Sequence, residues 1–268
     1  INKIVVSIFF MKSQLSIVEK RAISSKKLQN RLNLNSKLGS KDLTKWLFDR
    51  YKIKKNDIIL ELGCGIGNHV LKHSKIVGKN GLVLATDYSS ESLKVLKKNL
   101  KNKNIIIKCI SMDDIPGYLK NRKIKFDKII SSYALYYAKN PIRVIRECSK
   151  FLKPKGKFLI TAPCYPHTLT KFALKQKTLP NIAKKYIDFS SKQLEVFLKL
   201  NKCKTKIYNF KNTLKFRNLN DLLDFYRSTI FYNKKSEFSL NNFFTKSKKK
   251  IGFFNIIKSA KLYDFSLK

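Results

Sequence analysis

From residue 57 to residue 161 the chain alternates short runs of Ile, Val and Leu with amphipathic stretches, and this alternation restricts its fold more than any other feature. The apolar runs have the length of strands and are nearly continuous, which is typical of strands buried on both faces of a sheet. They span residues 58–62, 82–86, 105–110, 126–131 and 157–161, and the helical stretches between them span residues 69–77, 89–100, 115–121 and 141–152. Strands joined by helical crossovers predict a parallel α/β sheet.

The pattern changes on both sides of this region. Upstream, residues 40–51 have helical spacing with Ser40 as candidate N-cap, whereas residues 12–38 are polar and show no strong period. Downstream of Pro166, the pattern predicts helices at residues 192–200 and 219–231 and strands at residues 204–216 and 253–267.

A glycine-rich loop follows the first predicted strand. Residues 59–68 read Ile-Leu-Glu-Leu-Gly-Cys-Gly-Ile-Gly-Asn and lead into the first crossover helix. Glycine lets a backbone turn tightly and approach a ligand closely, and the N–H groups that start a helix attract an anionic group. Asp87 ends the second predicted strand, where an acid suits two ribose hydroxyls. Together these features predict a site for an adenosine-type cofactor.

The spacing of the glycines distinguishes between such cofactors. The dinucleotide fingerprint is Gly-x-Gly-x-x-Gly and serves a pyrophosphate. Here Gly63, Gly65 and Gly67 form Gly-x-Gly-x-Gly, with Glu61 two residues before the first glycine. A carboxylate at that position suits a ligand with an ammonium group better than one with two phosphates.

At this point the chain resembles the class I S-adenosylmethionine-dependent methyltransferases, and among them the small-molecule type. The resemblance rests on four segments in family order, which are residues 61–67, Asp87, residues 126–135 and residues 152–160. It covers about residues 40–165. It implies a Rossmann-like, doubly wound α/β fold with a mixed seven-stranded sheet in three layers. We expect residues 204–216 and 253–267 to be the last strands of that sheet.

The resemblance also implies S-adenosyl-L-methionine as cofactor and a role for each matching residue. Backbone groups of Gly63, Cys64, Gly65 and Gly67 hold the methionine part, and Glu61 lies near its ammonium group.

On the nucleoside side, the resemblance implies that Asp87 bonds the ribose hydroxyls and Tyr88 lies against the adenine. Met112 and Asp113 flank the adenine edge. Ser111 departs from the family, which usually carries an acid there, and Asp113 or its neighbour Asp114 is expected to substitute.

The ends of the fourth and fifth strands are expected to face the substrate. Ser131 and Tyr133 would lie toward the sulfonium and the acceptor. His167 and Tyr133 are the candidate catalytic residues, although an ordinary loop histidine is the alternative for His167. Tyr136 and Tyr137 either line the acceptor site or pack in the core.

No metal site is predicted. His69 and His73 are spaced four residues apart, as two ligands on one helix face are. Because no third ligand is in view, we expect a solvated helix face instead.

The charge leaves a second function open. The chain has 58 basic and 17 acidic residues, a net charge of +41, but only eight of the basic residues are Arg and the lysines are spread along the whole chain. We therefore expect a small-molecule acceptor. An RNA methyltransferase with a lysine-rich face is the alternative, and a non-catalytic scaffold subunit with the cofactor fold is the third hypothesis.

Residues 208–254, rich in aromatic and basic side chains, fit a lid over the acceptor or an RNA clamp.

The domain organisation is expected to be simple. Residues 39–268 form one methyltransferase domain with a substrate-lid insertion around residues 165–250, and residues 1–38 form an extension that is partly disordered or a lid. Met11 offers a second start position, so the status of residues 1–10 stays open. The five cysteines form no CxxC pair, and no apolar run reaches the ~20 residues that cross a bilayer, so we expect a cytoplasmic protein.

Overall fold

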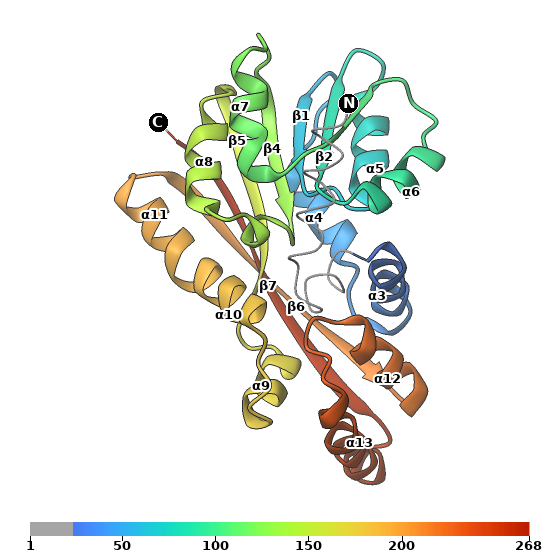
Figure 1. Ribbon diagram of the computed structural model, residues 1–268. Helices are drawn as coiled ribbons and strands as arrows, with labels where there is room; N and C mark the ends of the chain where they lie inside the picture. The colour runs from blue at the N-terminus through green and yellow to red at the C-terminus, as the bar shows by residue number, and fades with distance from the viewer. Residues whose placement is uncertain (1–23, 268) are drawn as a thin grey trace, which may run out of the picture.

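A mixed sheet of seven strands forms the centre of the computed structural model, which describes residues 24–267 (Figure 1). Expectations for residues 1–23, including the start at Met11, lie outside the described residues. The strands are β1 (Ile58–Leu62), β2 (Leu82–Asp87), β3 (Ile105–Cys109), β4 (Phe126–Ser132), β5 (Leu152–Cys164), β6 (Lys204–Phe216) and β7 (Phe254–Ser266). Their order in the sheet is β3-β2-β1-β4-β5-β7-β6. The predicted mixed seven-stranded α/β sheet is thereby confirmed.

Strands β1 to β5 are parallel because a helix crosses between each consecutive pair. In the central strand, Leu60 is in register with Leu84 of β2 and Ile129 of β4. Alternate side chains of β1 serve two different cores. Ile59 packs against α4 (Leu43–Tyr51), α5 (Asn68–Val77) and α6 (Ser90–Lys98), whereas Leu60 belongs to the core of the other helices.

The larger core lies on the opposite face and extends to the C-terminal half of the chain. It contains buried residues from α3 (Ser25–Leu38), α7 (Ile115–Lys120), α8 (Pro141–Ser149), α9 (Thr168–Lys175), α10 (Asn181–Asp188), α11 (Leu194–Leu200), α12 (Leu219–Ser228) and α13 (Glu237–Ile251).

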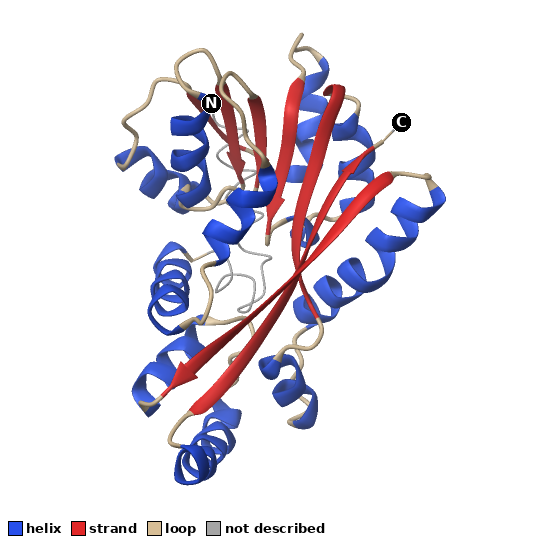
Figure 2. Cartoon of the chain, turned by 180° about the vertical axis from the view of Figure 1, so that it is seen from behind, coloured by secondary structure: helices blue, strands red, loops and turns tan. Residues whose placement is uncertain are grey.

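The last two strands form a long hairpin that extends past the rest of the sheet. β6 and β7 pair along their whole length, from Lys204 opposite Ser266 to Phe216 opposite Phe254. β5 pairs only with residues 259–265 of β7. The far half of the hairpin therefore leaves the sheet and carries α9, α12 and α13 around it (Figure 2).

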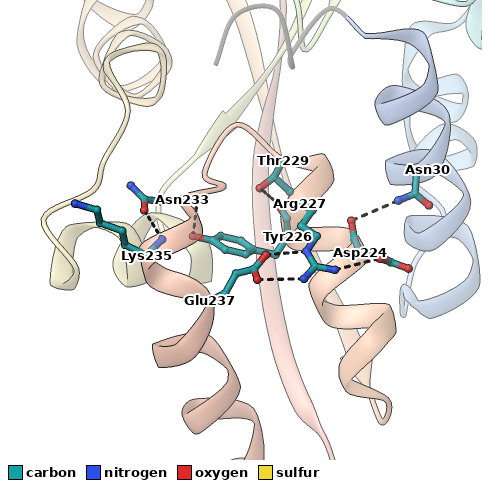
Figure 3. Close-up of polar contacts among 8 residues, drawn as sticks. All are labelled: Asn30, Asp224, Tyr226, Arg227, Thr229, Asn233, Lys235 and Glu237. Carbon is teal, nitrogen blue, oxygen red and sulfur yellow. Dashed lines mark hydrogen bonds and ion pairs between the residues drawn. The ribbon is translucent and has the colours of Figure 1, made fainter. Parts of the chain in front are cut away.

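Polar contacts fix the junction between α12 and α13 (Figure 3). Arg227 donates to both carboxylate oxygens of Glu237, at 2.7 and 3.1 Å. Nearby, the backbone N–H of Asn233 donates to the hydroxyl of Tyr226 at 3.1 Å. Helix α3 is joined to α12, because the side-chain amide of Asn30 donates to the backbone carbonyl of Asp224 at 3.4 Å.

Two N-terminal details differ from the sequence predictions. The cap of α4 is Asp42, whose carboxylate accepts from the N–H of Lys45, and Ser40 instead bonds Asn212 of β6 at 3.1 Å. Residues 25–38, which lack a strong period, form helix α3. Its apolar contacts are with α12 and β6, far away in sequence, so a local pattern carries little of the signal.

Candidate functional site

Three glycines turn the chain between β1 and α5. Gly63, Gly65 and Gly67 have left-handed backbone, with φ of 72°, 55° and 86°. The N–H groups of Gly63 and Cys64 both bond the carbonyl of Thr86 near the end of β2, at 2.8 and 2.9 Å. The loop therefore lies at the carboxyl ends of two neighbouring parallel strands, the position where open α/β sheets bind ligands.

The loop has no room for side chains at two of these positions. A Cβ at Gly63 would lie 2.3 Å from the Cβ of Ala134 and 2.8 Å from the Cε of Met112. A Cβ at Gly67 would lie 2.2 Å from Leu96. Only glycine satisfies both the backbone angles and this packing, so at these two positions the loop presents backbone groups alone, as a close ligand approach requires.

Asp87 contacts the glycine loop directly. Its Oδ2 accepts the N–H of Gly65 and its Oδ1 accepts the N–H of Ser89, both at 2.7 Å. Burial raises the pKa of the Asp87 carboxyl, although these N–H bonds oppose the rise. Each carboxylate oxygen can accept more than one bond, so the acid still has acceptor sites for two ribose hydroxyls.

Glu61 lies at the end of β1 and has a partner within the protein. Its Oε2 is 3.0 Å from Nδ1 of His73 in α5, and both side chains are buried. Phe48 of α4 stacks on the His73 ring with centroids 4.8 Å apart. The carboxylate is thus held in one orientation, with its second oxygen outside this contact.

The expected solvated face for His69 and His73 is wrong. His73 is fully buried, and burial lowers the pKa of the partly buried His69 to about 4. Phe48 and Tyr51 of α4 cover both rings, and these contacts come from residues about twenty positions away. Within residues 24–267, no three His, Cys, Asp or Glu side chains form a group that could hold a metal ion.

The turn after β3 holds the residues expected at the adenine edge. Met112 contacts the glycine loop through its Cε, as the packing at Gly63 shows. Asp113 accepts from the N–H groups of Lys139 and Asn140, at 2.9 and 3.1 Å. Ser111 caps this turn by accepting from the N–H of Asp113 at 3.3 Å. Asp113 therefore already braces the loop after β4, and its role toward adenine stays a prediction.

Tyr88, Ser131 and Tyr133 surround the same edge of the sheet. The Tyr88 hydroxyl is buried with no hydrogen-bond partner in the described part of the chain. Ser131 is fully buried and donates to the carbonyl of Leu62 at 3.1 Å, which ties β4 to β1. Tyr133 has left-handed backbone with φ of 55°, and burial raises the pKa of its hydroxyl.

His167 follows β5 and is buried. Its Nδ1 accepts the N–H of Leu169 at 3.2 Å, so it caps α9. Its ring stacks on Phe231 with centroids 5.3 Å apart. Burial, and next the charge of Lys258, lower the pKa of His167 to about 3. A ring that is already an acceptor at one nitrogen and carries its proton on the other is a poor general base.

Helix α3 covers the glycine loop, which sequence reasoning missed. A Cβ at Gly65 would lie 3.2 Å from the Cδ2 of Leu28. The sequence does contain leucines at positions 28, 32, 34 and 38, which could have indicated a helix with an apolar face. The Lys and Asn residues between them obscured this pattern. Among the helices of residues 24–267, none has the length and apolar content needed to cross a bilayer.

The chain is similar to known proteins over more than half of its length. Residues 53–216, more than half of the 268, match a family model described as a methyltransferase domain. The chain is 27% identical over 143 residues to a demethylmenaquinone methyltransferase of Lactobacillus johnsonii, covering 52% of this chain and 59% of that protein.

Two further proteins show the same likeness. The chain is 30% identical over 108 residues to the ubiquinone/menaquinone biosynthesis C-methyltransferase UbiE of Pectobacterium carotovorum, covering 40% of this chain and 43% of that protein. It thus spans about half the length of the curated relatives it matches. The crystal structure of the YcgJ protein of Bacillus subtilis has a similar fold, with a TM-score of 0.57, 13% identity, and coverage of 84% of this chain and 97% of that one.

Proposed function

This chain belongs to the methyltransferase-domain family, within the class I enzymes that use S-adenosylmethionine, and from that membership we propose that it transfers a methyl group to a small-molecule acceptor. The observation that carries the proposal is the contact between Asp87 and the N–H of Gly65. It joins the acid after β2 to the left-handed glycine loop after β1, at the sheet edge where nucleoside cofactors bind.

The chain's own residues divide the binding task. Backbone groups of Gly63, Cys64, Gly65 and Gly67 hold the methionine part. Glu61, which His73 orients, faces the ammonium group.

We assign the nucleoside part of the cofactor to residues at or just after the ends of β2 and β3. Asp87 accepts from the two ribose hydroxyls, and Tyr88, Met112 and Asp113 surround the adenine. Ser131 holds the ends of β1 and β4 together beneath the reacting centre.

When bound, the cofactor supplies a methyl carbon on a sulfonium, so the carbon–sulfur bond breaks with its electron pair going to sulfur while the carbon bonds the acceptor. The protein's contribution is to align the acceptor atom with that carbon and to exclude water. An acceptor that is protonated must also lose its proton, to solvent, because the raised pKa of Tyr133 keeps its hydroxyl protonated. His167, with its low pKa, caps α9 and takes no part in proton transfer in this proposal.

The acceptor class is supported by the similar proteins, which are a demethylmenaquinone methyltransferase and a ubiquinone/menaquinone biosynthesis C-methyltransferase. They favour a small molecule. The lysines that would argue for RNA are spread along the whole chain and not confined to one segment.

Calorimetry with S-adenosylhomocysteine tests the proposal. We expect saturable binding to the wild-type protein and an affinity at least several-fold lower for Asp87→Ala. Absence of binding by the wild type would overturn the proposal and favour a scaffold. The salt dependence of binding to a single-stranded RNA then separates the two enzymatic functions, because a steep log–log slope identifies a nucleic-acid acceptor.

A further inference from the structure

One face of α3 runs from the glycine loop toward β7. Leu28, Arg31 and Asn35 are spaced by three and four residues, so their side chains lie on the same side of the helix. At 1.5 Å per residue, Arg31 lies about 4.5 Å and Asn35 about 10.5 Å beyond Leu28 along the helix axis. Because Leu28 contacts Gly65, this face begins at the cofactor loop.

Two cations lie along that face. The ammonium group of Lys258, in β7, donates to Oδ1 of Asn35 at 2.9 Å and lies 5.7 Å from the centre of the Phe225 ring. The guanidinium of Arg31 donates to the backbone carbonyl of Ser228 at the end of α12. Within residues 24–267 no carboxylate forms an ion pair with Lys258.

The charge of Arg31 acts on Lys258, and both cations interact with residues around them. Burial, and next the charge of Arg31, lower the pKa of Lys258 to about 8. Burial also lowers the pKa of Arg31, an effect that Tyr137 and Tyr136 partly oppose. A guanidinium and an ammonium group that lie near each other can both donate to one anion between them.

The surroundings place these cations at the acceptor end of the site. Tyr136 and Tyr137 follow β4, which is the neighbour of β1 in the sheet, and His167 follows β5, the next strand beyond β4. Arg31 interacts electrostatically with Tyr137 and Tyr136, and Lys258 with His167, so both cations lie near the residues that follow β4 and β5.

We propose that Arg31 and Lys258 bind an anionic group of the acceptor, a carboxylate or a phosphate. The inference rests on the proposed function, since it assigns the chemistry of the acceptor in that same site. Guanidinium and ammonium groups are the usual partners of both anions, and charge-assisted bonds to them are among the stronger ones in proteins. The acceptor is accordingly an acid, with its anionic group held on the α3 side of the site.

Calorimetry on the S-adenosylhomocysteine complex tests this with three probes that share one ring, namely benzoate, phenyl phosphate and benzyl alcohol. The experiment is run at physiological salt, which screens exposed lysines at distances beyond ~8 Å. Lys258→Met removes the charge and keeps most of the side chain's length. Lys37→Met is the matched control, because Lys37 also ties α3 to a neighbouring element, through Asp221 at 3.4 Å.

We expect at least one anion to bind the wild type about tenfold more tightly than benzyl alcohol, and the tighter anion identifies carboxylate or phosphate. Lys258→Met should lose that preference while retaining its affinity for S-adenosylhomocysteine, and Lys37→Met should keep both. Equal binding of the three probes, failure of both anions to bind, or an unchanged preference in Lys258→Met overturns the inference. Failure of the wild type to bind S-adenosylhomocysteine is a separate result and overturns the proposed function.

Discussion

The imidazole of His73 lies 3.0 Å from the carboxylate of Glu61, and both side chains are buried between β1 and α5. A buried carboxylate with one fixed partner has little freedom to turn, so its remaining oxygen keeps one direction. In the proposed site that direction is toward the ammonium group of the cofactor.

The first prediction concerns this pair. His73→Phe keeps a ring beside Phe48 but removes the partner of Glu61, so we expect weaker binding of S-adenosylhomocysteine by about tenfold. Methylthioadenosine lacks the amino-acid part and should bind as it does to the wild type. Calorimetry with both ligands measures the difference, and an equal loss for both would show that His73 acts only through overall stability.

The second prediction is a pH dependence. Burial raises the pKa of Asp87 above its ordinary 3.8, so its carboxylate protonates at a higher pH than an ordinary aspartate. Because ribose hydroxyls donate to the ionised form, affinity for S-adenosylhomocysteine should fall as pH falls through that raised pKa. In Asp87→Asn the affinity should be low and this pH step absent; the same step in both proteins would assign it to another group.

The third prediction compares two glycines. Gly63→Ala places a Cβ 2.3 Å from Ala134 at a left-handed position, and we expect a loss of about 1–3 kcal/mol in the free energy of unfolding together with weaker cofactor binding. A Cβ added at Gly117 in α7 would have no other atom within 4 Å, so Gly117→Ala should raise the stability by up to ~1 kcal/mol. Urea unfolding of both variants checks this, and equal effects would contradict the packing argument.

The fourth prediction tests whether His167 acts as the N-cap of α9 or as a general base. His167→Asn preserves an acceptor for the N–H of Leu169, because Asn is a good N-cap. We expect the rate of methyl transfer to stay within about threefold of wild type, since general-base catalysis is typically worth about 10²–10⁴. The pKa of about 3 also predicts no inflection from His167 in the pH–rate profile above pH 5. A hundredfold loss of rate would restore His167 as the base.

The fifth prediction concerns the ion pair in Figure 3. The hydrogen bond from Arg227, and its charge, lower the pKa of Glu237, so the pair stabilises the fold above the ordinary 4.5 and loses its effect as pH falls below that value. Arg227 is half-exposed and Glu237 is partly exposed, so Arg227→Met should cost less than about 1 kcal/mol at pH 7 and less still at high salt. Urea unfolding at low and high salt measures this, and a larger, salt-independent loss would indicate buried packing by Arg227.

The parallel half of the fold and the glycine loop were predictable because their signals are local. Buried strands appear in the sequence as apolar runs, and the glycine loop and Asp87 directly follow two of these runs. The placement of His73 was not predictable in the same way. Its burial depends on Phe48 and Tyr51, which reach it only after α4 packs on α5.

Helix α3 illustrates the same limit. Its sequence is rich in Lys and Asn, and what stabilises it is its packing on α12 and β6, nearly two hundred residues away. The roles of Arg31 and Lys258 depend on that packing, so neither residue stood out from the other basic side chains of the chain.

The hairpin of β6 and β7 separates the proposed acceptor site from the proposed cofactor site. The glycine loop and Asp87 rest on strands β1 and β2, whereas α12, α13 and Lys258 are carried by the half of the hairpin that extends past β5. Substitutions or length changes in that protruding half can therefore alter the proposed acceptor site while the strands under the proposed cofactor site keep their architecture. A protein with this architecture can evolve to use new acceptors without changes in the residues that are proposed to bind the methyl donor.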